Sequence, residues 1–308
     1  MINLKKVLLF CLLIILIPVI IVNTFIKTDE IKFEYKENMS VRVKRSNDEI
    51  QKIPLEEYIV GVLAGEMPIT FKEEALKAQA VAARTYVLKK MSYNIKNEYD
   101  VVDTVMDQVY LDNDKLKESW KDKYLDNINY LRKIVLETNS EYMTYNDDII
   151  EAFYFSTSSG YTENSEDVFI NSVPYLRSVE SSWDNISPVY EETKYFTLYD
   201  FFSKLNIKYS TELNIEYIDK TNTGRIKKLR INNVLKTGKE ITTALSLRST
   251  HFTIEKINNI VKIDTKGYGH GVGMSQYGAE AMARQGYTYQ DILKYYYQGI
   301  EIKNMYKS

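Results

Sequence analysis

The sequence predicts an α+β protein of mixed sheets and helices, with a transmembrane helix at its N-terminus. Three observations support this. Residues 7–22 form an unbroken apolar run, helix signals with capping residues lie near both ends of the remaining chain, and short alternating strand patterns lie between them. Within that part, the composition shifts at about residues 192–262. We therefore expect a second lobe there, with the two lobes forming a substrate cleft.

The apolar run follows Lys5 and Lys6. About 20 residues suffice for a helix to cross the hydrocarbon core. A cleavable signal peptide is the alternative, but its apolar part is usually about 7–15 residues long and ends at small residues, a pattern that residues 20–26 lack. We expect an uncleaved anchor within residues 1–28 and, by the positive-inside rule, a single-pass membrane protein whose residues 29–308 are extracytoplasmic.

The composition excludes several kinds of function. The 40 basic and 42 acidic residues nearly balance, so there is no electrostatic signature of nucleic-acid binding. The single cysteine, Cys11, lies inside the apolar run, which excludes disulfides and cysteine nucleophiles from the predicted exported domain. His251 and His270 are the only histidines, and no zinc-ligand spacing is present. We expect no metal and no cofactor.

The element pattern begins with alternation that predicts short strands over residues 29–53. A helix follows between Pro54 and Pro68. Thr70 and Glu73 have the spacing of a capping box, which predicts that the next helix starts there.

Farther along, residues 92–130 are polar and mixed, which predicts a loop with one short helix at about 115–122. Two strands over residues 141–161 would be joined by a turn at 146–148. Thr288 has the pattern of an N-cap for the last helix.

Glu66 is the candidate catalytic residue. It lies at the C-terminal end of the first predicted helix, where the macrodipole disfavours an ionised carboxylate and favours the protonated form that a general acid needs. The alternative is an ordinary helix-end glutamate. Lys77 and Arg84, seven residues apart on the next helix, share one face. They would hold substrate carboxylates or hydroxyls, or else form a solvated charged face.

Two further segments carry candidate substrate-binding residues. Ser156, Thr157 and Ser158 follow a predicted strand and offer hydroxyls to a sugar, or form an ordinary polar turn. The glycine-rich segment 267–278 matches neither a dinucleotide fingerprint nor a Walker loop. Its glycines indicate a backbone that approaches a sugar or another strand closely.

That segment also contains His270, Ser275, Gln276 and Tyr277 as candidate contacts. His270 would donate to the substrate, support Glu66, or be a structural histidine.

These segments together resemble the stage II sporulation protein D family, with the motifs in order over roughly residues 50–300. The matching blocks are Ile53 to Tyr58, Gly65 to Pro68, Glu74 to Tyr86, Ser156 to Ser158, Leu176 to Val179, Trp183 and Asp184, Leu247 to Thr250, and His270 to Gly278. The resemblance implies a lytic transglycosylase that cuts peptidoglycan glycan strands during engulfment of the forespore. Its partners would be other engulfment-complex membrane proteins and a peptidoglycan amidase.

Carried over from the family, Glu66 would be the single acid/base, and Lys77 and Arg84 would matter for activity. Some members hold zinc near the Ser-Thr-Ser loop with a histidine just before it; Phe155 stands in that place here. Two alternatives remain open. One is a non-catalytic glycan-binding scaffold, and the other is a muramidase whose second carboxylate would be Asp184 or Glu151.

Overall fold

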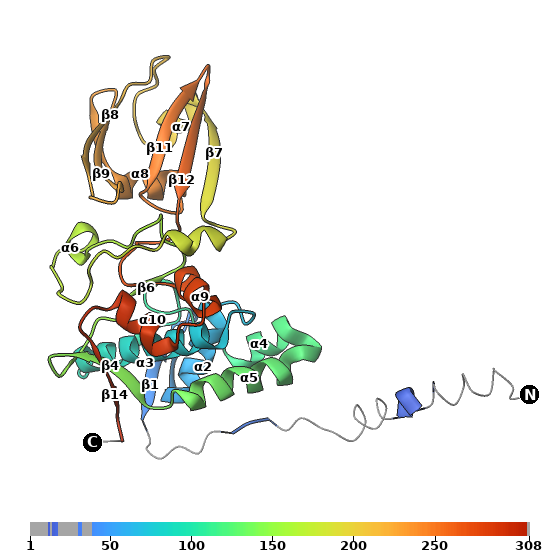
Figure 1. Ribbon diagram of the computed structural model, residues 1–308. Coiled ribbons are helices and arrows are strands. Elements are labelled where there is room, and N and C mark those ends of the chain that lie inside the picture. The colour runs from blue at the N-terminus through green and yellow to red at the C-terminus, as the bar shows by residue number, and fades with distance from the viewer. Residues whose placement is uncertain (1–11, 13, 18–29, 33–38, 307–308) are drawn as a thin grey trace, which may run out of the picture.

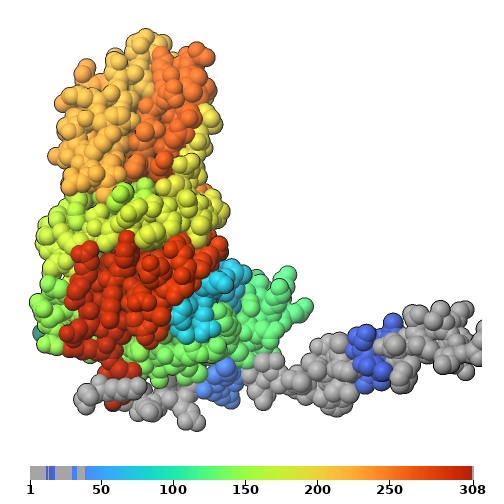
Figure 2. Space-filling model, in the orientation of Figure 1, coloured from blue at the N-terminus to red at the C-terminus, as the bar shows by residue number. Residues whose placement is uncertain are grey.

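The computed structural model describes residue 12, residues 14–17 and 30–32, and residues 39–306. It confirms the α+β class. The predicted anchor falls mostly outside these residues, and within them no helix is both long enough and apolar enough to span a membrane. The described chain forms a helical body and a smaller β-rich lobe, and Figures 1 and 2 show the lobe stacked on the body with residues 160–190 at the junction.

The body is built around α3 (Glu73–Tyr93), a long helix that packs against the body's other main helices and against β4. The helices that contact it are α2 (Leu55–Glu66), α5 (Tyr124–Glu137), α9 (Gln276–Arg284) and α10 (Tyr289–Tyr296). Its alanines at 75, 78, 80, 82 and 83 are fully buried. Because alanine side chains are small, these neighbours approach α3 closely on several sides.

Small sheets complete the body. β1 (Ser40–Lys44) pairs antiparallel with β2 (Ile50–Pro54) and parallel with β3 (Val101–Val102). A second sheet has the order β14-β4-β5, from Glu301–Asn304, Glu141–Tyr145 and Asp148–Ile149. The third contains only β6 (Tyr154–Phe155) and β13 (Met274–Ser275), paired in parallel. This last pair joins distant parts of the chain beside α2 and α9.

The lobe has its own hydrophobic core, centred on buried residues such as Phe201, Phe202 and Leu229. Two three-stranded antiparallel sheets and two helices enclose it. The first sheet has the order β10-β9-β8 and the second β11-β12-β7. The elements are β7 (Glu191–Thr197), α7 (Leu198–Lys204), β8 (Ile215–Lys220), β9 (Ile226–Ile231), β10 (Val234–Thr237), α8 (Gly238–Leu245), β11 (Phe252–Ile257) and β12 (Ile260–Lys266). The range 192–262, where a second lobe is expected, falls inside this unit.

Two local predictions are wrong. Thr70 and Glu73 form no capping box, since the N-cap of α3 is Lys72 and its backbone N–H donates to the Glu280 carboxylate of α9 at 2.6 Å. Residues 92–130 are also more helical than expected. Besides α4 (Asn113–Trp120), they contain the first half of α5, whose apolar face is buried against α2 and α3.

Candidate functional site around Glu66

The site begins with the local sequence of α2. Gly61 and Gly65 lie one helical turn apart, and a Cβ atom at Gly65 would lie 2.6 Å from the carbonyl oxygen of Val109. Because both positions are glycine, the extended segment 108–111 lies directly across the helix, where the Leu111 N–H donates to the Gly61 carbonyl at 3.2 Å. That close approach places a backbone donor beside the last residue of α2.

Glu66 is that last residue, and its carboxylate is half-buried and held from several directions. The Val109 N–H donates to Oε1 at 2.7 Å, and Gln276 Nε2 donates to Oε2 at 3.4 Å. The Tyr154 hydroxyl also lies within hydrogen-bonding reach of the carboxylate. Burial raises the pKa of Glu66, and these three donors oppose the rise because they favour the ionised form. Burial thus stabilises the protonated form of the Glu66 carboxyl, and the three hydrogen-bond donors stabilise its ionised form.

The parallel pair of β6 and β13 brings two of those donors together, although they lie more than a hundred residues apart in the chain. Met274 pairs with Tyr154 and Ser275 with Phe155, so Gln276 begins α9 next to the tyrosine. Gly273, with φ of +81°, precedes this pair. A Cβ atom there would lie 2.0 Å from the Phe153 carbonyl oxygen. Of the two possibilities for the glycine-rich segment, close approach to another strand explains this glycine.

A chain of buried hydrogen bonds holds the Tyr154 hydroxyl in place. Gln108, fully buried, donates to the Tyr154 hydroxyl at 3.0 Å and accepts from the Tyr58 hydroxyl at 3.1 Å. Gln108 and Tyr154 were not among the residues predicted from the sequence. Tyr154 immediately precedes Phe155 and the hydroxyl-rich loop, but no sequence signal connects either residue to Glu66.

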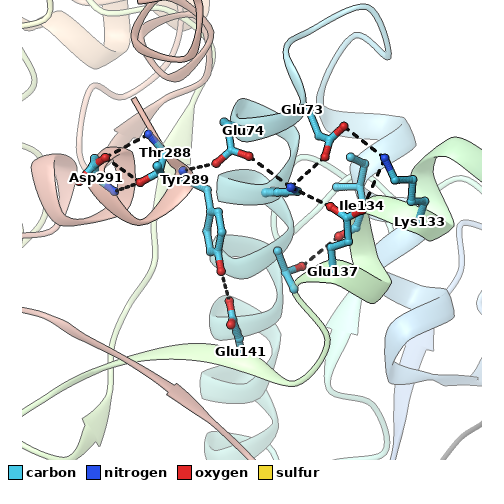
Figure 3. Close-up of polar contacts among 11 residues, drawn as sticks. Glu73, Glu74, Lys133, Ile134, Glu137, Glu141, Thr288, Tyr289 and Asp291 are labelled. Atoms are coloured by element: carbon cyan, nitrogen blue, oxygen red, sulfur yellow. Dashed lines mark hydrogen bonds and ion pairs between the residues drawn. The ribbon is translucent and has the colours of Figure 1, made fainter. Parts of the chain in front are cut away.

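Lys77 and Arg84 do not face this site. The side chain of Lys77 pairs with Glu73, Glu74 and Glu137 at 2.7–3.2 Å. Figure 3 shows these carboxylates gathered between neighbouring helices, with Glu74 also accepting from the Tyr289 N–H. These contacts raise the pKa of Lys77, although burial opposes the rise. They link α3, α5 and the start of α10.

Arg84 is fully buried, and its guanidinium forms a forked pair with the Glu56 carboxylate at 2.6–3.1 Å. It also donates to the Glu141 carbonyl. Both cations thus have acidic partners, Lys77 on its own helix and on α5, and Arg84 on α2. That they hold substrate stays a prediction.

The hydroxyl-rich loop is also mainly structural. Thr157 and Ser158 are fully buried, with Thr157 bonded to the Ser187 hydroxyl at 2.9 Å and Ser158 donating to the Ser181 carbonyl at 3.0 Å. Ser156 is half-buried and contacts the Thr157 hydroxyl.

Asp184 is the centre of this network. It accepts from the Ser158 N–H and from the hydroxyls of Ser181 and Ser275. Burial raises the pKa of this carboxyl, and those donors oppose the rise. Thr157, Ser158 and Ser275 thus have buried structural partners, and Ser275 in addition caps α9. Their predicted contact with substrate stays a prediction.

His270 and Tyr277 have different surroundings. The imidazole Nδ1 of His270 accepts from the Val272 N–H at 3.1 Å, and its ring lies 5.6 Å from Phe155 and 5.7 Å from Phe169. Burial lowers the pKa of His270 to about 4, which makes it neutral at physiological pH. Its described contacts are with these groups rather than with Glu66. Tyr277 is half-buried and meets the Phe71 ring edge-on at 5.0 Å.

Fold and site thus define an α+β protein with one desolvated carboxyl at a helix end. The sequence model of a protein family, described as "SpoIID: Stage II sporulation protein", matches residues 44–145 of this chain. Stage II sporulation protein D of Bacillus subtilis (strain 168) is 43% identical over 270 residues, which cover 86% of this chain and 79% of that protein. The same protein of Bacillus amyloliquefaciens is 43% identical, with 86% and 78% covered. This chain belongs to the stage II sporulation protein D family.

A more distant similarity is to the amidase enhancer of Bacillus subtilis (strain 168). It is 31% identical over 294 residues, which cover 78% of this chain and 39% of that protein.

Proposed function

We propose that this protein is a lytic transglycosylase that cleaves peptidoglycan glycan strands, with Glu66 as its only acid/base. Family membership supports a sporulation-related role in the cell wall. The observation that carries the finer proposal is the Glu66 carboxyl, whose pKa is raised by burial while the Val109 N–H lies 2.7 Å away. A raised pKa keeps the proton available, and a nearby donor stabilises the charge left when the proton is given up.

The chemistry needs one carboxyl used twice. Protonated Glu66 donates to the glycosidic oxygen between N-acetylmuramic acid and N-acetylglucosamine as the C1–O bond breaks. The resulting carboxylate then takes the proton from the 6-hydroxyl of the muramoyl residue, whose oxygen attacks C1 and closes a 1,6-anhydro ring. The proton returns to Glu66, and the substrate supplies the nucleophile. A second protein carboxylate is unnecessary, unlike in hydrolysis by a carboxylate pair.

The surroundings of the other two candidate carboxylates bear on the muramidase alternative. Asp184 is fully buried and already accepts three hydrogen bonds, so it is poorly placed to activate water. Glu151 is half-buried and accepts from the Tyr93 hydroxyl at 2.8 Å. Glu151 is therefore the residue on which a hydrolytic mechanism would depend.

The test compares Glu66→Gln with the wild-type protein on purified glycan strands. Glutamine keeps the size and hydrogen bonding but cannot transfer a proton, so cleavage should fall by about 10²–10⁴-fold. Glu73→Gln is the control, since Glu73 pairs with Lys77 away from this site. Mass spectrometry of the products should show 1,6-anhydro ends. Reducing ends that disappear in Glu151→Gln would establish the muramidase, and glycan binding without cleavage by the wild type would establish the scaffold.

The proposed setting is the outer face of the cell membrane. The apolar run of residues 7–22 would anchor the protein with its N-terminus in the cytoplasm. We further propose that it works with other membrane proteins of engulfment and with a peptidoglycan amidase; one relative is itself named an amidase enhancer. The proposed mechanism uses no metal or cofactor. The absence of a bound metal stays a prediction, which metal analysis of the purified protein would test.

A further inference from the structure

A cavity lies at the junction of body and lobe, and its lining does not include Glu66 or the groups around it. Its volume is about 450 Å³, within the range of small-ligand sites. The body contributes α6 (Ser165–Val168) with Phe169, and also the Gly269–His270 turn. The lobe contributes β9, the start of α8 and residues 247–250. Figure 1 shows α6 at this junction, below β8 and β9.

The lining combines positive charge with apolar walls. The cations are Arg225, Lys227, Lys239 and Arg248, whereas Asp167 is the only carboxylate among the described residues that line the cavity. Three cations have carboxylate partners: Lys227 pairs with Asp167 at 2.6 Å, Arg248 with Glu192 at 3.2 Å, and Arg225 with Glu163 at 3.4 Å. Glu163 and Glu192 do not line the cavity. An anionic group would therefore meet more positive than negative charge.

Lys239 is the cation best placed to receive that group. It is exposed at the first turn of α8, and no ion pair or hydrogen bond of its ammonium is found within the described residues. The capping box of α8 already uses the Thr237 and Glu240 N–H groups at this turn, so the free positive charge comes from the Lys239 ammonium and not from the helix end. Phe169 from the body and Leu247 from the lobe add apolar surface to the lining, suited to the carbon skeleton of a sugar or a short peptide.

One strand connects this cavity to the proposed cleavage site. Successive residues of a strand point to opposite faces. On β6, Tyr154 reaches Glu66, while Phe155 contacts the His270 ring that lines the cavity. Tyr154 and Phe155 therefore lie on opposite faces of one strand, the first toward Glu66 and the second toward the cavity lining.

We propose that this cavity binds a carboxylate carried by the peptidoglycan strand, so that the lobe recognises muramic-acid units next to the bond that Glu66 cleaves. The inference rests on the proposed function. Two carboxylates have this chemistry in peptidoglycan. One is the lactyl group of muramic acid, and the other is the free end of a peptide attached to that lactyl group.

The test measures binding of small probes to the purified full-length protein by calorimetry. N-acetylmuramic acid carries the lactyl carboxylate. N-acetylmuramoyl-L-alanyl-D-isoglutamine has an amidated lactyl group and a carboxylate on its peptide. N-acetylglucosamine has neither. At least one of the two acidic probes should bind about tenfold or more tightly than N-acetylglucosamine, with an affinity that falls at high salt. The stronger of the two identifies the source of the carboxylate.

Lys239→Glu should reduce that binding by at least about tenfold. Lys228→Glu is the matched control, since Lys228 is an exposed lysine of β9 that does not line the cavity. Equal binding of all three probes, or equal effects of the two variants, would overturn the proposal.

The measurement also separates this inference from the cleavage proposal. Glu66→Gln should reduce cleavage by about 10²–10⁴-fold but leave binding of the acidic probe unchanged. If wild-type protein cleaves glycan but binds no acidic probe, the cavity proposal alone fails. If it binds the probe and does not cleave, only the cleavage proposal fails.

Discussion

Glu66 illustrates how burial and hydrogen bonding set opposing preferences on one residue. From the sequence, the helix macrodipole was the reason to expect a retained proton; in the structure, burial is the main cause of the raised pKa. A raised folded-state pKa means that the folded protein binds more protons than the unfolded chain. The contribution of Glu66 to stability therefore decreases as pH rises through the range between its ordinary and raised pKa. Glu66→Gln should consequently leave the melting temperature at neutral pH equal to or slightly above that of the wild type.

Tyr154→Phe tests the donors around that carboxyl. The tyrosine hydroxyl favours ionised Glu66, so its removal should raise the Glu66 pKa further. Because the general acid must be protonated, kcat/KM falls above its pKa, and the alkaline limb of the pH profile should move to higher pH. Measuring kcat/KM against pH for both proteins checks this. A uniform loss of activity with an unmoved limb would show that Tyr154 affects only packing.

Arg84→Ala should act through stability. The substitution leaves the Glu56 carboxylate buried without its cation, a change that typically costs about 3–5 kcal/mol. Denaturant unfolding should show a loss of that size. The double variant Arg84→Met with Glu56→Leu should recover much of it, because no lone charge remains. If Arg84→Ala abolished cleavage while keeping wild-type stability, the guanidinium would have a direct role that its present contacts do not explain.

Among the elements, α2 and the segment across it form the unit that positions Glu66. Gly65→Ala is its sharpest test, because the added Cβ would lie 2.6 Å from a backbone oxygen that cannot rotate away. Helix propensity favours alanine by about 1 kcal/mol, but overpacking typically costs about 1–3 kcal/mol, so a net loss is expected. Thermal unfolding and glycan cleavage should both decrease. A variant as stable and active as the wild type would show that the 108–111 segment shifts freely.

Helix α3 shows the limit of local capping signals. The spacing of Thr70 and Glu73 predicts a capping box, but α3 begins after Lys72, and the Lys72 N–H donates to the Glu280 carboxylate of α9. Glu280 is nearly fully buried and also pairs with Arg284 at 2.7 Å. By contrast, the pattern at Thr288 is confirmed, with the Thr288 and Asp291 side chains forming a complete capping box on α10. The confirmed signal lies at an exposed turn, whereas the N-terminus of α3 packs against the buried Glu280 of α9.

At the scale of the whole molecule, the remaining prediction concerns topology. If residues 7–22 span the membrane with Lys5 and Lys6 inside, protease added to cells stripped of their wall should digest the body and lobe. Immunoblotting for an epitope within residues 39–306 would report this. Protection of that epitope in intact stripped cells, with digestion after lysis, would show that the orientation is wrong.

The sequence by itself determined the α+β class, the family, the helix that ends at Glu66 and the confirmed cap at Thr288. These follow from local periodicity, from turn and capping residues, and from motifs in order. Only the tertiary structure decided which charges are paired. Lys77 and Arg84 look alike as helix cations in sequence, but Glu137 of α5 and Glu56 of α2 become their partners only when the helices pack. The same holds for Tyr154, Gln108 and Gln276, since burial and hydrogen-bond partners depend on contacts between segments that local patterns do not encode.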